Sequence, residues 1–345
     1  MFRKIKYIVK YIASNGVKQF ILNARAVRDK HGGFLPFIVF DMLYCSVRYG
    51  AGPFEYKLFD YKKLGRVQRG GMISQMRNQK FVAKLNTPAA RKLFDNKSDF
   101  NRAFEPFLRR EWVDAETVSF DEFANKVGNW KVLVCKPPDG MCGKGIEFIE
   151  VESSQDLRSI YEYIKEQGIT TVEQLVRQHP DIAEINPLSV NTLRMVTLTV
   201  SGGVHLVACY MRFGIGSQVD NLNSGGFAVS VNPKSGIIDS SGGNNAGRMY
   251  ERHPHTGAEL RGRQLPFFLE TRKMIAQTAM VEPGAGYVGW DAAITPDGPL
   301  LIEGNCFPGF DLYHLVSHQE QGAGMYQRFK AVIAGKTNEF LIAPN

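Results

Sequence analysis

The chain has 345 residues, of which 44% are hydrophobic, so it is long and apolar enough to bury a core and to divide into two or three lobes. Its five cysteines are scattered and odd in number, which argues against a disulfide framework and favours a reducing compartment. Residues 1–95 hold 19 Lys or Arg and 5 Asp or Glu, a net charge of +14, whereas the remainder carries a net −6. A basic lobe on an acidic body indicates a polyanionic partner (a phosphorylated substrate, an anionic membrane or nucleic acid), unless these side chains only solvate helices.

The N-terminal region is expected to be mainly helical. Its first segment carries apolar residues at helical spacing on one side (Phe2, Ile5, Val9 and Ile12) and basic residues on the other. Such a helix either lies on anionic lipid or packs against its own domain. The segments 35–48 and 72–93 also show helical patterns, so we expect residues 1–95 to form one basic helical lobe.

Targeting signals give a simple expectation for location. Lys6 and Lys10 interrupt the first apolar run, so no secretory signal is recognised. The longest apolar stretch, 34–47, contains Asp41 and is too short to span a bilayer. We therefore expect a cytoplasmic protein, with contact at the inner membrane face as an alternative.

From Asn96 the pattern becomes α/β. A helix is expected from Asn96 to about Arg110, with Ser98 as its N-cap. Residues 130–136 form a strand that ends in Lys136, and a glycine-rich loop then leads into a returning strand at 146–151 and a helix at 153–167. This loop is either a plain hairpin turn or a flap whose backbone N–H groups approach phosphate oxygens, with Lys136 and Lys144 supplying charge.

Two further strands carry arginines. After a short strand at 170–176, the segments 191–200 and 204–213 form a hairpin. A three-residue loop that pairs Val200 with Val204 places Arg194 and Arg212 on one face, whereas a two-residue closure would separate them. Guanidinium groups so placed suit bidentate binding of phosphate or carboxylate; the alternative is that they pair with surface acids.

The segment 240–265 lacks periodicity and is expected to be a long surface loop, in which His253 and His255 are solvated. A helix is expected at 265–280, and a closing helix from Asp311 to Ala334.

Between these helices lies the hairpin on which the functional interpretation depends. Thr295-Pro-Asp-Gly298 has the residues of a tight turn, because proline presets the first turn position and Gly298 tolerates positive φ. A three-residue loop would place Asp291 opposite Glu303, with Asn305 on the same face. Facing carboxylates repel unless a hard cation such as Mg²⁺ lies between them. The alternative is that both acids are solvated on an ordinary hairpin.

Taken together and in this order, these features resemble the ATP-grasp superfamily, and more closely its sugar-transfer-associated branch. The resemblance spans about residues 50–330 and rests on five strings: Gln178-His-Pro180, Val190-Asn-Thr-Leu-Arg194, Met211-Arg-Phe-Gly214, Val219-Asp-Asn221 with Gly225-Gly226, and Gly289-Trp-Asp291 with Glu303-Gly-Asn305. It implies an α+β chain with the ATP-grasp fold, in which two α+β lobes (96–176 and 177–345) clasp ATP below the basic, mainly helical lobe (1–95). One departure is Met141-Cys142, in a flap where smaller residues are common.

The resemblance also implies a set of site residues. Lys97 and Lys136 would contact the phosphates of ATP under the flap, which includes Gly140, Gly143, Lys144 and Gly145. Glu173, Gln174 and Val176 would hold the adenine, and Asn191 belongs to the same nucleotide site. Asp291, Glu303 and Asn305 would hold Mg²⁺, and Arg194 and Arg212 would steady the transferred phosphoryl group or the substrate carboxylate.

The expected activity is that of an ATP-dependent carboxylate–amine ligase that forms an acyl phosphate, captured by an amine. Its substrates would be small carboxylates and amines, including amino acids or a sugar, polysaccharide precursor or glycoconjugate. A kinase that phosphorylates a hydroxyl group is one alternative. Another is a binding module for anionic membranes or nucleic acid, although residues 1–95 lack the arginine and aromatic strings expected for nucleic acid.

Overall fold

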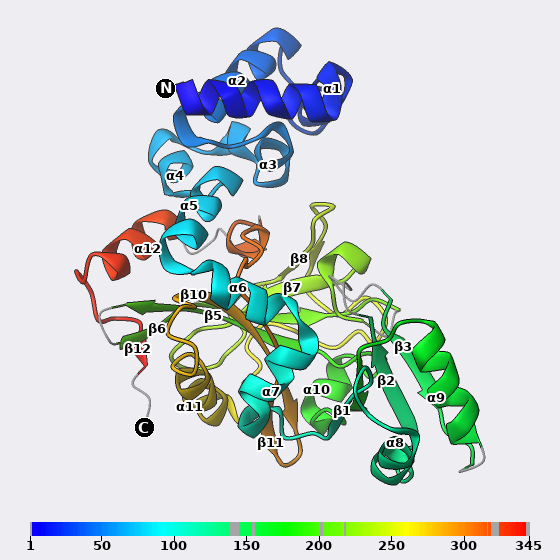
Figure 1. The fold of residues 1–345 in the computed structure, drawn as a ribbon. Coiled ribbons are helices and arrows are strands. Elements are labelled where there is room, and N and C mark those ends of the chain that lie inside the picture. Colours follow the sequence, from blue (N-terminus) through cyan, green and yellow to red (C-terminus); the bar gives the residue numbers. More distant parts are fainter. Residues whose placement is uncertain are drawn as a thin grey trace.

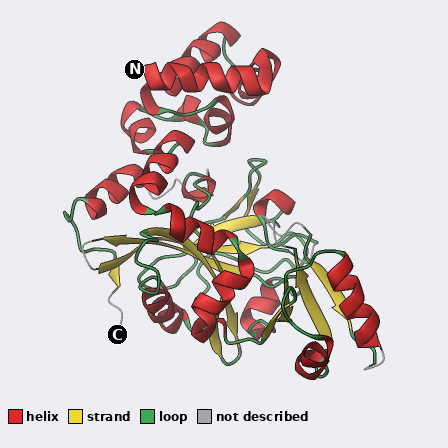
Figure 2. Cartoon of the chain, viewed as in Figure 1, coloured by secondary structure: helices red, strands yellow, loops and turns green. Residues whose placement is uncertain are grey.

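The structure of the protein is a computed structural model. It describes residues 2–137, 145–153, 156–200, 203–216, 219–315, 317–318 and 324–342, with side chains from Val17 onward. In the view of Figures 1 and 2, the helical N-terminal lobe lies at the top and the large sheet lies below it. A smaller α+β lobe lies beside the large sheet, at the lower right.

The N-terminal lobe is helical, as the sequence predicts. Its helices are α1 (Phe2–His31), α2 (Leu35–Tyr49), α3 (Pro53–Leu58), α4 (Arg66–Gly71), α5 (Gln75–Leu85) and α6 (Pro88–Asp95), with a 3₁₀ turn, η1 (Tyr61–Lys63). The prolines at the starts of α3 and α6 suit the first helical turn, where no backbone donor is needed. This lobe shares its core with the large sheet, because Phe20, Met42 and Phe59 belong to one buried cluster with Leu198 and Phe329.

The smaller lobe begins after α7 (Lys97–Leu108). It holds an antiparallel sheet with the strand order β1-β4-β2-β3, built from β1 (Trp112–Asp114), β2 (Val132–Lys136), β3 (Glu147–Glu150) and β4 (Thr171–Gln174). The helices α8 (Phe120–Val127) and α9 (Leu157–Glu166) pack with this sheet around their own buried cluster. The N-cap of α7 is Asn96, whose side chain accepts a hydrogen bond from Asp99 N; the prediction of Ser98 is therefore wrong.

The large sheet has the order β11-β10-β5-β6-β7-β8-β9, and β12 pairs with the free side of β6. Its strands are β5 (Thr192–Val200), β6 (Gly203–Phe213), β7 (Phe227–Ser230), β8 (Gly242–Gly243), β9 (Met249–Tyr250), β10 (Tyr287–Thr295), β11 (Gly298–Asn305) and β12 (Leu341–Ile342). The face away from the N-terminal lobe contributes to a second core with α6, α7, α10 (Pro180–Ile185) and α11 (Phe268–Thr278). The short 3₁₀ turns η3 (Leu222–Ser224) and η4 (Asp311–Tyr313), with α12 (Met325–Ile333), complete the named elements.

The C-terminal hairpin, β10–β11, reaches the predicted register by a different route. Thr295 pairs with Gly298, so the loop has two residues rather than three, and Gly298 takes φ +113°. A β-bulge follows, at which Ile302 is the extra residue on β11. The extra residue on β11 compensates for the loop being one residue shorter than predicted. Asp291 therefore still lies opposite Glu303.

The β5–β6 hairpin behaves in the same way. Val200 pairs with Gly203, which is a two-residue closure, and Val207 is then the extra residue of a bulge in β6. Beyond it Arg194 pairs with Tyr210, as predicted for the longer loop. Arg194 and Arg212 therefore share one face, and the expectation that a two-residue closure would separate them is wrong, since it did not allow for the bulge.

Two other segments differ from the sequence predictions. Region 240–265 contains β8 and β9, and His253 is buried with its Nε2 3.0 Å from Gly214 O, so the expectation of a solvated side chain is wrong for His253, whereas His255 is exposed as expected. The predicted closing helix is also shorter, because residues 311–313 form η4 and α12 begins at Met325. Among the described helices, none is long and apolar enough to cross a membrane.

Candidate nucleotide-binding site

A pocket lies between the two sheets, where the ends of β2, β4 and β11 meet the start of β5. Its enclosed part has a volume of about 140 Å³. One side is apolar, and the other carries cations and acids; the predicted residues among its lining are Lys97, Lys136, Glu173, Gln174, Val176, Arg212 and Glu303. Sequence reasoning missed other lining residues, among them Val134, Ile146, Phe148, Thr192, Asp220 and Ile302.

Glu173 is the centre of a buried ion cluster that joins the small lobe to the C-terminal hairpin. Its carboxylate accepts hydrogen bonds from Lys136 Nζ at 2.6 Å, Arg110 Nε at 2.8 Å and Asn101 Nδ2 at 3.1 Å. Arg110 also donates to the carbonyl oxygens of Leu301 and Ile302 on β11. Although burial alone would raise it, the pKa of Glu173 is held at about 2 by Arg110 and Lys136. Glu173 therefore positions Lys136. The sequence had predicted for Glu173 only a contact with adenine.

This cluster predicts a specific pH dependence of stability. A carboxyl group whose pKa is about 2 when folded and near 4.5 when unfolded stabilises the folded state above pH 4.5, and this stabilisation is lost as the pH falls toward 2. We expect Glu173→Gln to lower the free energy of unfolding by about 3 kcal/mol at pH 7, and by much less near pH 2.5. Urea unfolding of both proteins across this range measures the difference, and a difference independent of pH would contradict the assignment.

Asp291 lies at the centre of a second buried ion cluster, beneath the pocket. It is fully buried, and both guanidinium groups predicted on the adjoining face turn to it. Arg194 binds it in bidentate fashion, with Nη2 2.8 Å from Oδ2, and Arg212 Nη2 also donates to Oδ2 at 2.8 Å. Burial favours the neutral acid, but Arg194 and Arg212 lower the pKa of Asp291 to about 2. A glycine at position 289 admits Arg194, because a Cβ there would lie 3.2 Å from Arg194 Cδ.

Arg212 connects this cluster to the pocket wall. Its Nη2 donates to Thr192 Oγ1 at 2.6 Å, and Thr192 in turn donates to Asp220 Oδ2 through its backbone N at 2.8 Å and its hydroxyl at 2.5 Å. Burial raises the pKa of Asp220. Asp220 was not among the predicted site residues. The sequence signal that could have identified it is the Val219-Asp-Asn221 string in which it lies.

Glu303 and Asn305 are the members of the predicted metal set that solvent reaches. Both are exposed, and they share a face of β11. The surrounding protein atoms and the negative charge of Asp291 raise the pKa of Glu303 to about 7. Asn305 Oδ1 accepts a hydrogen bond from Phe307 N at 2.7 Å.

The donor set fits Mg²⁺ in a limited sense. A hard cation could lie against Glu303 near Asp291, because the two residues face each other and both offer oxygen ligands. In the described part of the chain, however, no group of three His, Cys, Asp or Glu side chains could hold a metal. Glu303 and Asn305 would therefore need oxygen atoms of a bound phosphate to complete the coordination, with Asp291 contributing mainly by its charge.

Among the other predicted residues, Asn191 and Gly145 lie outside the lining of this pocket, and several flap residues lie outside the described chain. Asn191 is buried, and its amide donates to Gln178 Oε1, Asn186 O and Ser189 O at 2.8–3.0 Å, so it fixes the loop before β5. Gly140, Gly143 and Lys144 lie outside the described residues. Gly145 takes φ +74°, and Lys97 Nζ donates to Pro137 O at 2.8 Å, close to the two ends of the predicted flap.

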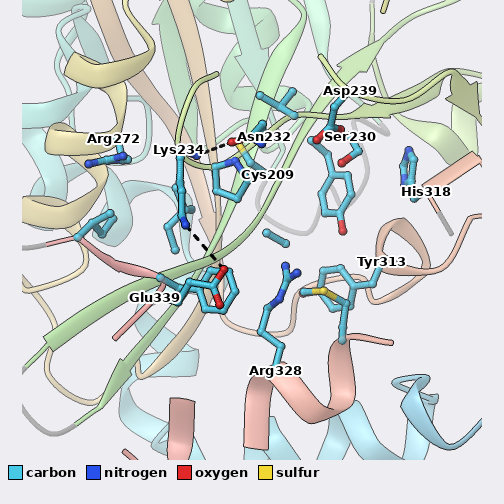
Figure 3. Close-up of a pocket in the computed structure, with 18 of the residues that line it drawn as sticks. Cys209, Ser230, Asn232, Lys234, Asp239, Arg272, Tyr313, His318, Arg328 and Glu339 are labelled. Carbon is cyan, nitrogen blue, oxygen red and sulfur yellow. Dashed lines mark hydrogen bonds and ion pairs between the residues drawn. The ribbon is translucent and has the colours of Figure 1, made fainter. Parts of the chain in front are cut away.

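A second cavity, of about 240 Å³, opens where β7 and β12 leave part of β6 unpaired (Figure 3). Arg328 and Asp239 lie on opposite sides of it. Arg328 Nη1 donates to Val207 O at 2.7 Å, and its guanidinium lies 4.5 Å from the centre of the Phe340 ring. Asp239 Oδ1 is buried and has no hydrogen-bond partner among the residues that the structure describes. At the rim, Lys234 Nζ lies 3.7 Å from Glu339 Oε1.

Comparison with solved structures finds similar overall arrangements at low identity. The chain is similar to D-cycloserine synthetase DcsG (10% identity, TM-score 0.45, covering 76% of this chain and 80% of that one) and to D-alanyl-alanine synthetase A from Vibrio cholerae (13%, 0.44, 73% and 67%). It is also similar to an L-amino acid ligase from Bacillus licheniformis (11%, 0.44, 72% and 51%). Among curated proteins, none matches the sequence significantly.

The family comparison is decisive, because the model described as "Sugar-transfer associated ATP-grasp" matches residues 76–333. This range includes the small sheet, the large sheet except β12, the pocket between the sheets and the two buried ion clusters. It confirms the fold class expected from the motif strings. The chain therefore belongs to the sugar-transfer-associated ATP-grasp family.

Proposed function

We propose that the protein is an ATP-dependent ligase that joins a carboxylate to an amine through an acyl phosphate. The observation that carries this proposal is the pocket between the sheets, in which an apolar wall adjoins Lys97, Lys136, Arg212 and the acid Glu303. The family assignment and the ligase names of the similar structures agree with it.

The residues present fit ATP as the second substrate. Val134, Ile146 and Phe148 would pack against the base, and the backbone of residues 174–176, where β4 ends, would bind its edge. Lys97 and Lys136 would bind phosphate oxygens, and Glu303 with Asn305 would hold Mg²⁺ there. When bound, MgATP supplies an activated phosphoryl group.

The protein's own groups position reactants and compensate charge. The Glu173 cluster holds Lys136 at the pocket wall, and the Asp291 cluster holds Arg212. These preorganised cations would stabilise the negative charge that develops as the substrate carboxylate receives the phosphoryl group. The reaction requires no side-chain nucleophile, because the carboxylate and then the amine are themselves the attacking groups.

We assign the second cavity to the part of the acceptor that lies away from its reacting amine. Tyr210 lines this cavity and Arg212 lines the nucleotide pocket, and these residues are two positions apart on β6, or about 7 Å. An acidic group of the acceptor would bind Arg328, and a hydroxyl or amine would donate to the unpartnered Asp239 oxygen.

Asp239→Asn tests this assignment. We expect it to raise KM for the acceptor at least about 10-fold, with kcat and KM for ATP little changed, because a hydrogen bond to a charged group contributes about 1.5–3 kcal/mol. Asp121→Asn, at an exposed position on α8 outside both pockets, is the matched control and should leave all three constants unchanged. Unchanged acceptor KM in Asp239→Asn would contradict an acceptor site in this cavity.

Product analysis tests the reaction class. Incubation with ATP, candidate acids and candidate amines should yield ADP, inorganic phosphate and an amide in equal amounts. Adding hydroxylamine in place of the amine should give a hydroxamate, since hydroxylamine traps acyl phosphates. ADP formed without phosphate release, with a phosphorylated alcohol as product, would instead establish the kinase alternative.

The family's description supports a narrower choice of substrates. A carboxylate-bearing sugar, a polysaccharide precursor or a glycoconjugate is the class that we propose to test first, with amino acids as candidate acceptors. Uronic acids as carboxylate donors, paired with amino acids, provide the direct comparison with simple acids in the same product assay.

A further inference from the structure

The outer face of α2 is aromatic and uncovered. Phe37 and Phe40 have exposed fractions of 73% and 70%, and Tyr44 follows one turn later on the same face, with Leu43 beside it. Phe34, just before the helix, is also exposed, and its ring centre lies 5.5 Å from that of Phe37 in an edge-to-face contact. The described residues of the chain leave this stripe in contact with solvent.

The opposite face of α2 already forms the core of the lobe. Ile38, Met42, Cys45 and Tyr49 are buried there, against α1 and α3 among other elements. Helix α2 is thus apolar on both sides, a pattern typical of a helix that is covered all round. Large exposed aromatic patches of this kind mark interaction sites rather than ordinary surface.

The exposed charges of the N-terminal lobe select among possible partners. Between residues 17 and 70, the exposed charged side chains are Lys18, Arg25, Arg28, Lys30, Arg48, Lys63 and Arg66, against the single acid Asp29. The other acids of this range are partly or fully buried and form contacts within the lobe. Asp60 binds Lys30 and His31, and Asp41 binds Arg69. Glu55 accepts hydrogen bonds from the backbone N–H groups of Gly52 and Gln75. The described surface of this lobe is therefore positively charged, and one of its exposed cations, Arg48, lies one turn beyond Tyr44 on α2.

We propose that the α2 stripe docks the protein on an anionic lipid surface. Aromatic side chains favour the boundary between head groups and acyl chains, and the exposed lysines and arginines of the same lobe are attracted to anionic head groups. Helices α1 and α2 form the outer end of the helical lobe, away from the small lobe (Figure 1). Docking there would leave the pocket between the sheets open to its substrates.

Vesicle co-sedimentation of the full-length protein tests the proposal. We expect binding to vesicles that contain phosphatidylglycerol, little binding to phosphatidylcholine alone, and weakening at 0.5 M salt. The double variant Phe37→Gln/Phe40→Gln should reduce the apparent partition coefficient at least about 10-fold, with an unchanged thermal unfolding temperature and unchanged ATP turnover. Leu269→Ser, on the exposed surface of α11, is the control and should bind as the wild type does.

Two results would overturn the proposal. One is equal vesicle binding by the double variant and the wild type, or no binding by either. The other is a dimer of the wild-type protein in light scattering that the double variant converts to a monomer without any change in vesicle binding, which would assign the stripe to contact between two copies of this chain. Because the readout is lipid binding, neither result depends on whether the ligase assignment is correct.

Discussion

Glu303→Gln is expected to reduce turnover at least about 10³-fold while the fold stays intact. The amide is neutral and nearly the same size, so it removes the charge that would hold Mg²⁺ against the phosphates without opening a cavity. Because the surrounding protein atoms and the charge of Asp291 raise the pKa of Glu303 to about 7, its ionised form does not stabilise the fold, so the thermal unfolding temperature should not fall. Steady-state ADP formation and thermal unfolding measure the two effects.

Asp297→Asn is the control for this variant. Asp297 lies on the same hairpin, at its exposed two-residue turn, and has no place in the pocket. Its amide variant should retain wild-type turnover. Normal turnover by Glu303→Gln at low Mg²⁺ would refute the assignment of Glu303 to the metal.

Asp291→Asn should lower the free energy of unfolding by about 3–5 kcal/mol, because it leaves the buried guanidinium group of Arg194 without its counter-ion and leaves Arg212 only Asp220, 3.5 Å away. Arg194 and Arg212 each donate to this carboxylate, and Asp291 itself has no exposed surface. Turnover should fall as well, since Arg212 loses one of the groups that orient it, with Thr192 and Asp220 remaining. Urea unfolding at pH 7 gives the stability change.

An exposed ion pair provides the comparison for Asp291. Asp99 binds Arg102 at 2.8 Å with about half of each side chain in solvent, so Asp99→Asn should cost less than about 1 kcal/mol. A loss for Asp291→Asn that is as small as this would show that the two arginines find other partners. The cluster would then be less important to the fold than its geometry indicates.

The sequence allowed prediction of which strands would face each other, because the alternation of apolar residues and the turn residues around Pro296 act locally. It did not reveal how the registers are reached. A two-residue turn with a one-residue bulge gives the same strand pairing as a three-residue turn without a bulge. Asp291 and Glu303 therefore lie opposite each other in either case. The sequence also does not show that close packing requires a glycine at position 304 of the Glu-Gly-Asn motif. A Cβ at Gly304 would lie 2.6 Å from Phe94 Cε1.

Contacts between distant segments account for what the sequence did not predict. Arg110 has no motif around it, yet it joins Glu173 to the carbonyl oxygens of β11, 191 residues away in the case of Leu301. Asp291 and the two arginines were predicted as separate metal and phosphate ligands, because the spacing of residues does not indicate that opposite charges on adjacent strands neutralise each other. The uncovered face of α2 likewise depends on which elements pack around it.

Equilibrium binding of a non-hydrolysable ATP analogue, measured by calorimetry with and without Mg²⁺, tests the central claim that the pocket between the two sheets is a magnesium-dependent nucleotide site. The wild type should bind the analogue with 1:1 stoichiometry, and Mg²⁺ should strengthen binding. In Glu303→Gln the effect of Mg²⁺ should largely disappear, whereas Lys136→Met should weaken binding under both conditions. Binding that is unaffected by Mg²⁺ and by both substitutions would place the nucleotide elsewhere and contradict the account.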